Sequence, residues 1–373
     1  MEELLIYIEM IEDVRQQTKV LHKLLDIVVI VLFAKLANAD DWEEIADFAY
    51  YNEDFLKQYI ALENGVPSHD TIQRVMSNIE PNCIQKLYDK WNELLNTNEG
   101  EKLKKIICID GKTMCGSKSK THKAQHIVSA WSDTDGFCLG QKAVEEKTNE
   151  ITAIPQLLDT IRIKGNIITI DAMGTQTAIA EKIREKRADY VLAVKENQKN
   201  LYNNIKDFFD DEEFLEKIKQ NENYIKTTEK AHSQIEIREY YQTDKIKWLE
   251  GKEKWKGIKS IGMVCKTIMR DNTKITEKRY YISSLKPDIE MFSKSIRQHW
   301  SVEIMHWHLD VTFKEDANKT QEKTAVQNIN IINKWCLSIL KIFQIGTKKR
   351  SMKKKRFCIS MNTKEFLTQI MNL

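Results

Sequence analysis

Three acidic residues stand in settings from which carboxylates can hold metal ions. Asp110 follows the apolar residues 106–109, Asp171 follows a second apolar or β-branched run at 167–170, and Glu303 lies in a stretch with helical periodicity. Carboxylate oxygens are the ligands that Mg²⁺ and Mn²⁺ prefer, and three of them suit two such ions. Two ions roughly 4 Å apart can activate a water or a 3′-hydroxyl against a phosphodiester. The set therefore predicts two-metal phosphodiester chemistry without a protein nucleophile.

The two aspartates share one sequence context. Asp110 opens Asp-Gly-Lys-Thr, in which Gly111 is expected to let the chain turn tightly beside the site, and Asp171 opens Asp-Ala-Met-Gly. The alternatives are a turn-forming aspartate for Asp110 and an N-cap for Asp171. A buried strand that ends in a carboxylate presents it at the sheet edge, where α/β proteins place their sites. The recurrence of strand, acid and small residue favours the functional interpretation.

Glu303 depends on the geometry of its predicted helix. One apolar stripe is formed by Val302, Met305, Leu309 and Phe313. Glu303 and Asp310 fall together on an adjoining face of the helix. The alternative is an ordinary solvated polar face, but the flanking Trp300 and Trp307 argue against it because so much aromatic surface is usually buried. Asp310 remains a competitor for the role of third ligand.

Strands and helices alternate in the part of the chain that contains both aspartates. The sequence predicts helices at residues 151–161 and 177–187 and strands at residues 105–110, 126–131, 139–144, 166–170 and 190–194. Periodicity alone supports only a mixed α/β class. Three adjacent strands followed by helix, strand, helix and strand is, however, the order of a ribonuclease-H-like sheet. We therefore expect an α/β fold with a ribonuclease-H-like mixed sheet as its core.

The remaining segments flank or interrupt this core. Residues 1–100 show helical spacing and predict an N-terminal all-helical domain, with polar residues at its end. The core is expected to span residues 101–345 and to be interrupted at about 199–288 by a β-rich insertion on the sheet. The strand-like stretches of the insertion are at residues 235–241, 258–267 and 276–283. The helix of Glu303 is predicted at 291–314, and a basic tail at 346–373.

The composition is that of a soluble globular protein. The 373 residues are 42% hydrophobic with a net charge of +3, so any affinity for nucleic acid must come from local patches. Seven cysteines without a CxxC pair argue against a disulfide framework and against structural zinc. The acidic start predicts no signal peptide, and the apolar run at residues 27–34 is too short for a membrane span and predicts a buried helix. We therefore expect a cytoplasmic protein without a membrane partner.

Two segments are candidates for contact with DNA. The basic run at residues 348–356 can neutralise phosphates, and its alternative is a solvated tail. Residues 67–79 can form the second helix of a helix-turn-helix with Arg74 exposed, but a packing helix capped by Ser68 is favoured. Without a zinc-like spacing, the following histidines are only candidate polar contacts: His122, His126, His232, His299, His306 and His308.

Motifs spread over nearly the whole chain resemble one known family. Among them are Ile-Asp-Gly-Lys-Thr at 109–113 and Thr-Ile-Asp-Ala-Met-Gly at 169–174. The others are residues 39–45, 67–71, 126–131, 148–155, 189–195, 297–303 and 306–313. With these motifs the chain resembles the DDE insertion-sequence transposases of the H-repeat-associated group. So many matches in one order make the resemblance highly specific.

The resemblance implies a site, a cofactor and partners. It implies that Asp110, Asp171 and Glu303 are the acidic triad and bind two Mg²⁺ or Mn²⁺ ions, on a ribonuclease-H-like core with a β-rich insertion before the helix of Glu303. The implied activity is strand cleavage and transfer at the ends of a mobile element. The implied partner is DNA, both as terminal inverted repeats and as target. Such transposases commonly act as homodimers on paired ends, although the sequence contains no dimerisation motif.

The same resemblance bears on contacts with DNA. Arg297 matches an arginine that precedes the glutamate in related transposases and is expected to contact DNA there. We expect Lys314 and Lys112 to contact DNA as well.

Four positions depart from the family pattern. Ile304 stands where the family usually has Asn, Glu196 and Ser233 each replace a Gly, and Gln234 replaces an Arg. These departures raise an alternative to a transposase, namely a catalytically decayed copy that acts only as a DNA-binding protein. A standalone structure-selective nuclease is a third hypothesis.

Overall fold

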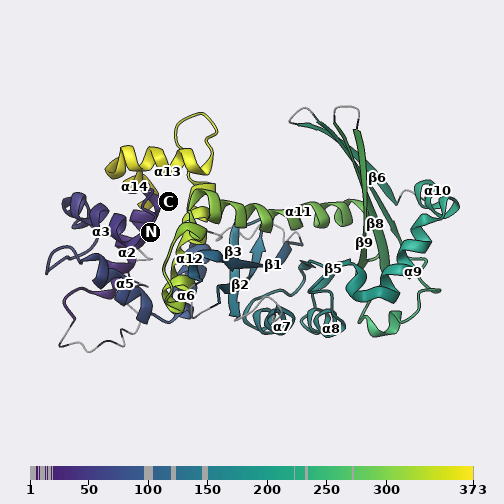
Figure 1. Ribbon diagram of the computed structural model, residues 1–373, viewed down its shortest axis with the longest axis horizontal. Helices are drawn as coiled ribbons and strands as arrows, with labels where there is room; N and C mark the ends of the chain where they lie inside the picture. The colour runs from purple at the N-terminus through teal and green to yellow at the C-terminus, as the bar shows by residue number, and fades with distance from the viewer. Residues whose placement is uncertain are drawn as a thin grey trace.

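A nine-stranded mixed sheet forms the centre of the molecule (Figure 1). The computed structural model describes residues 20–95, 104–118, 123–144, 150–221, 223–231, 234–270 and 273–372, together with Ile6, Ile8, Asp13, Arg15 and Thr18. The domain boundary expected near residue 100, and His122 and His232, lie outside the described residues.

The first five strands form the predicted core. They are β1 (Ile106–Met114), β2 (Gln125–Ser132), β3 (Phe137–Val144), β4 (Ile167–Ile170) and β5 (Asp189–Val194). Their spatial order is β3-β2-β1-β4-β5, with β1 antiparallel to β2 and parallel to β4. Three antiparallel strands followed by two parallel crossovers are the ribonuclease-H-like arrangement, so the predicted fold class is confirmed.

Strand β1 is longer than the sequence predicted. It continues for four residues past Asp110, and Gly111 pairs with Val128 of β2. The tight turn expected at Gly111 is therefore absent, and the prediction of that turn was wrong. Apolar periodicity ends at Asp110, but pairing with β2 continues because the remainder of β1 still has a hydrogen-bonding neighbour.

Helices cover both faces of the core sheet. Helices α7 (Glu150–Thr160) and α8 (Thr177–Glu185) lie on one face, and the long helix α11 (Ile289–Trp307) lies across the other (Figure 1). Alternate residues of each strand point to opposite faces. Accordingly, Ile107 and Ile109 pack in one apolar cluster with the α7 and α8 side, whereas Cys108 packs in the other. Strand alternation thus decides which residues meet α11.

The insertion extends the same sheet instead of forming a separate one. After α9 (Lys199–Asp210) and α10 (Glu212–Gln220) come β6 (Tyr224–Ala231), β7 (Gln234–Thr243), β8 (Ser260–Arg270) and β9 (Thr273–Ser283). Strand β9 pairs antiparallel with β5, and the order continues β9-β8-β7-β6. The far ends of these strands project from the core as a twisted arm (Figure 1). The sequence did not predict β6.

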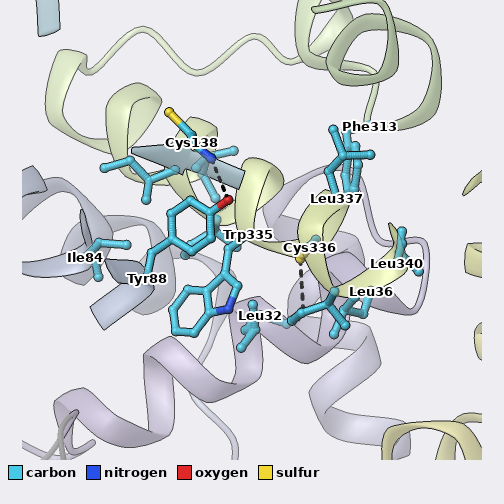
Figure 2. Packing of buried hydrophobic residues seen from close by; sticks show 14 of the residues in the cluster. Leu32, Leu36, Ile84, Tyr88, Cys138, Phe313, Trp335, Cys336, Leu337 and Leu340 are labelled. Carbon is cyan, nitrogen blue, oxygen red and sulfur yellow. Dashed lines mark hydrogen bonds between the residues drawn. The ribbon is translucent and has the colours of Figure 1, made fainter. Parts of the chain in front are cut away.

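The amino-terminal helices and the sheet share one core through α12 (Lys323–Ile342). The amino-terminal helices are α2 (Leu24–Leu36), α3 (Trp42–Tyr51), α4 (Glu53–Leu56), α5 (His69–Asn78) and α6 (Pro81–Leu95). Figure 2 shows Trp335 of α12 beside Tyr88 of α6, whose hydroxyl accepts a hydrogen bond of 3.1 Å from the backbone of Cys138. All of α2 is buried, as predicted for the apolar run.

The basic carboxyl-terminal segment is folded. It forms α13 (Met352–Met361) and α14 (Thr363–Met371), and Lys355 and Arg356 are buried. The solvated-tail alternative is therefore wrong for these two residues, because their side chains donate hydrogen bonds to backbone carbonyls inside the protein. Within the described residues, no helix has the length and the apolar content needed to cross a bilayer.

Candidate active site

Strand register brings Asp110 and Asp171 side by side. In the parallel pairing of β1 with β4, Ile109 is the partner of Ile170, and each aspartate is the next residue along its chain. The β1–β4 pairing ends at this point, so the sheet opens where the carboxylates stand. Residues directly paired across parallel strands point to the same face. Both aspartates therefore follow Cys108 and Thr169 toward the α11 face of the sheet.

Helix α11 is anchored to this face by polar contacts one turn before Glu303. The Cys108 thiol donates to the Gln298 carbonyl at 3.2 Å, and Thr169 Oγ1 lies 2.9 Å from His299 Nδ1. Glu303 follows His299 by four residues, so the helix presents its carboxylate one turn farther along the same side. Sheet and helix thus direct the three acids toward one space.

That space is an open cleft of about 950 Å³. Asp110, Asp171 and Glu303 line it together with His299 and Trp300. Further lining residues come from β5, the following loop, α9 and β9: Val194, Lys195, Glu196, Asn197, Tyr202, Glu277, Lys278, Arg279 and Tyr280. The lining therefore combines the three candidate acids with three cations and with two further acids, Glu196 and Glu277.

Asp110 has a strongly raised pKa. Burial, together with the neighbouring charges of Asp171, Glu150 and Glu303, raises its pKa to about 7, although a backbone hydrogen bond from Gly111 opposes the shift. Burial also raises the pKa of Glu303, while Arg279 opposes that shift. Excess negative charge of this kind is what a bound cation would neutralise.

Two half-buried histidines stand beside the acids in their neutral form. Burial lowers the pKa of His299 to about 4 and that of His306 to about 3. His306 Nδ1 lies 3.5 Å from Asp110 Oδ2, and its Nε2 atom has no hydrogen-bond partner among the described residues. Neutral imidazoles contribute no positive charge to the cleft.

Asp310, the competitor for the third position, lies elsewhere. It belongs to a π-helical turn, His308–Thr312, that continues α11, and it does not line the cleft. Its carboxylate is 2.6 Å from Lys112 Nζ, in a group that also contains Glu315 and Asp316. The position of Asp310 therefore favours Glu303 as the third acid.

The expected DNA contacts fall in three different environments. Lys112 is only 8% exposed and is surrounded by the three carboxylates of that group, so its position gives no support to a role in DNA binding. Lys314 is exposed, with a left-handed backbone, and lies 2.7 Å from Asp40. Arg297 is exposed on α11 and lies 3.2 Å from Glu229 of β6. Neither Arg297 nor Lys314 lines the cleft.

The cations that do line the cleft were missed by sequence reasoning. Arg279 is on β9 and Lys195 follows β5, so the pairing of β9 with β5 brings both into the lining of the cleft. Their signal was weak, because a cation in a strand of alternating charges resembles any solvated residue. Pairing of β9 with β5 was the missing information.

The structure also shows the surroundings of Asp171 and of the departing residues Ile304 and Glu196. Helix α8 begins at Thr177 with Gln176 as its N-cap, so Asp171 is not a helix cap, and its carboxylate accepts from Gly174 N at 3.1 Å. Ile304 is 56% exposed and outside the cleft. In the Glu196 loop, Asn197 donates to the Ala172 carbonyl at 2.6 Å, which ties this loop to the chain after Asp171.

The oxygen atoms of the three acids are of the type that divalent metal ions prefer as ligands. They are carboxylate oxygens around an open cleft, which suit Mg²⁺ or Mn²⁺. In the described parts of the chain, no three His, Cys, Asp or Glu side chains already converge on one point. The three acids therefore line one cleft but do not form a ready-made metal site.

Comparison with known proteins gives one consistent result. Residues 101–339 match the family described as Transposase DDE domain, and residues 5–92 match the one described as DDE_Tnp_1-associated. "Putative transposase YncI" of Escherichia coli O157:H7 is 40% identical over 96% of this chain and 92% of its own length. "H repeat-associated putative transposase YhhI" of Escherichia coli K12 is 38% identical over 95% of both chains.

Two further similarities are more limited. "Inactive transposase YbfQ" of Escherichia coli K12 is 47% identical over 77 residues, which are 21% of this chain and 92% of that protein. The cryo-EM structure of a piggyBac transposase synaptic complex with hairpin DNA aligns with a TM-score of 0.41 and 13% identity, over 100% of this chain and 80% of that chain. The family match and the full-length relatives are decisive, and this chain belongs to the DDE transposase family.

Proposed function

We propose that this chain is a catalytically active DNA transposase that cleaves and joins phosphodiesters with two Mg²⁺ or Mn²⁺ ions. Asp110, Asp171 and Glu303 would hold the ions. Its substrates would be the terminal inverted repeats of an insertion sequence and a target DNA. We further propose that it works as a homodimer on paired ends, in association with the bacterial nucleoid.

One observation carries the proposal. Two aspartates occupy equivalent positions on adjacent parallel strands, and a helix anchored to the same strands brings a glutamate to the same cleft. Asp110, largely buried among like charges, has a raised pKa in the absence of a cation. A structural cluster of acids would be paired with lysine or arginine, as Asp310 is with Lys112. The acids of the cleft therefore fit a metal-binding role.

Different residues of the chain would bind the ions, orient the side chains of the cleft and contact the DNA. When bound, the ions supply activation of the attacking oxygen and stabilisation of the leaving oxygen. Pairing with β2 fixes Asp110, Asp171 directly follows β4, and the Thr169 contact fixes the imidazole of His299 in the lining of the cleft. Lys195 and Arg279 line the same cleft, where they can neutralise phosphates of the bound strand.

The test is cleavage of the DNA that flanks the gene. Purified protein is incubated with duplexes carrying those flanks, either with Mg²⁺ or with EDTA. We expect nicking at the element ends that requires the metal and is lost in Asp110→Asn, while DNA binding persists. Asp310→Asn is the matched control, because it removes the same charge outside the cleft and should still cleave.

The other outcomes of this experiment would favour an alternative function or refute the proposed site. Binding of the flanking DNA by the wild-type chain without nicking would favour the decayed copy that only binds DNA. Cutting of branched DNA regardless of its terminal sequence would favour the standalone nuclease. Full activity of Asp110→Asn would refute the proposed site.

A further inference from the structure

A second cluster of cations lies on the insertion, next to the cleft. It consists of Arg238 on β7, Lys266 on β8, and Arg279 on β9, with Arg297 of α11 beside them, and all four line a small pocket around Trp300. Figure 1 shows how this arises, since the amino-terminal half of α11 reaches the base of the arm. We call this cluster the arm pocket. Arg279 and Trp300 also line the cleft, so the two spaces are adjacent.

The register of the sheet places Lys266 between a cation and an acid. It is directly paired with Arg238 across β7 and β8 and with Glu277 across β8 and β9. Like charges in directly opposite positions of an antiparallel pair destabilise a sheet, and opposite charges stabilise it. Burial lowers the pKa of Lys266, and the positive charges of Arg238 and Arg279 lower it further. The sheet thus holds cations together at a cost in stability, which an anionic ligand would remove.

The carboxylates of the arm pocket compensate its charge only in part. Glu236 and Glu229 pair with Arg238, Glu229 also pairs with Arg297, and Glu277 pairs with Arg279. These are three acids for four cations. The carboxylate nearest to Lys266 is Glu236 at 3.6 Å, which is too long for a hydrogen bond. Lys266 and Arg279 keep 23% and 38% of their side chains exposed, so both can be reached from solvent.

Trp300 orients the two reachable cations. Lys266 Nζ lies 5.7 Å from the centre of its ring and the Arg279 guanidinium lies 5.3 Å from it, both within the range of cation–π contact. Such contacts hold a cation in place while leaving its N–H donors available. Because Trp300 precedes Glu303 by less than one helical turn, the pocket sits beside the acids of the cleft.

We propose that the arm pocket binds a backbone phosphate of the DNA strand that passes through the cleft, with Lys266 and Arg279 as the contacting residues. The inference rests on the proposed function for the identity of the ligand. It assigns the insertion a direct part in holding the substrate. Arg238 is largely enclosed by Glu236 and Glu229 and serves to position them.

The experiment measures how DNA binding depends on salt. Binding of a fluorescein-labelled 40-base-pair duplex, a length of about four helical turns, is followed by anisotropy at several NaCl concentrations in the presence of EDTA. Each lost phosphate contact lowers the log–log slope by about 0.9 and weakens binding about fivefold at 0.15 M salt. We expect this change for Lys266→Gln and for Arg279→Gln. Arg279→Lys should keep the wild-type slope because it keeps the charge.

The matched control is Lys274→Gln. Lys274 lies on β9, carries the same charge, and is exposed outside both spaces. Its slope should equal that of the wild type, and circular dichroism should show all four variants to be folded. Unchanged slopes for both Lys266→Gln and Arg279→Gln would overturn the inference.

The outcome separates this inference from the proposed function. A wild-type chain that binds DNA with the predicted slope changes but never nicks it would refute catalysis and leave the arm pocket supported. A wild-type chain that nicks DNA, together with wild-type slopes for both variants, would support catalysis and refute the role of the arm pocket. A wild-type chain that does not bind the duplex would refute both.

Discussion

At the scale of single residues, the ionisation of Asp110 affects both the charge of the cleft and the stability of the folded protein. Its pKa is about 7 when folded, because the residue is buried among acids, and about 3.9 when unfolded. A carboxyl whose pKa is raised by folding stabilises the protein while it is protonated. That contribution is complete below about pH 4 and is lost as the pH rises through 7. The metal-free protein should therefore lose stability over this window.

The corresponding prediction compares the wild type with Asp110→Asn without divalent ions. The free energy of unfolding in urea should be similar for both near pH 4, where Asp110 is neutral. At pH 8 the variant should be more stable by up to about 4 kcal/mol, because Asn carries no charge. Added Mg²⁺ at pH 8 should stabilise the wild type and not the variant. Equal pH profiles for the two proteins would contradict the raised pKa.

At the scale of elements, β1 is packed so tightly beside Asp110 that Gly111 has no room for a side chain. A Cβ atom at this position would overlap His126 Nε2 and the Glu150 carboxylate. These two groups are buried and share a hydrogen bond of 2.6 Å between β2 and the start of α7. Gly111 is thus required by packing between three elements and not by a turn.

We predict that Gly111→Ala destabilises the fold by on the order of 2–4 kcal/mol. It must either strain the strand or break the buried His126–Glu150 hydrogen bond. Urea unfolding followed by tryptophan fluorescence measures the change. The double variant His126→Ala, Gly111→Ala should lose less stability than the sum of its single variants, because the first change makes room for the methyl group. Simple additivity would argue against this steric explanation.

The elements that sequence patterns predict are those with one apolar face. The strand order of the core and the helices between its strands follow from such faces, and so did the positions of Asp110 and Asp171. Strand β6 was missed because its residues Tyr224–Ala231 are mostly polar and exposed on an arm that projects into solvent. The cations that line the cleft were missed because their position depends on pairing between β5 and β9, which are separated by the whole insertion. Periodicity carries no information about such long-range pairing.

At the scale of the whole molecule, one buried arginine joins three distant parts of the chain. Arg356 of α13 donates to the carbonyls of Lys35 and Ala39, near the end of α2, and to that of Thr312, in the turn after α11. It also pairs with Asp40 at 3.1 Å, and Asp40 in turn pairs with Lys314 at 2.7 Å. The helix that carries Glu303 is thereby fixed to the amino-terminal and carboxyl-terminal helices. A run of lysines and arginines gives no sign of this, since the usual position of such residues is the surface.

The last prediction follows from this arrangement and concerns Arg356→Met. The substitution keeps the apolar stem of the side chain but leaves Asp40 with only the exposed Lys314 as a partner, and it removes one donor from each of the carbonyls of Lys35, Ala39 and Thr312. Removing one member of a buried pair costs about 3–5 kcal/mol. Thermal and urea unfolding should show that loss, whereas Lys354→Met, an exposed change in the same helix, should stay within about 0.5 kcal/mol of the wild type. If both variants unfold like the wild type, Arg356 does not join the three parts, and the basic segment is dispensable for the fold.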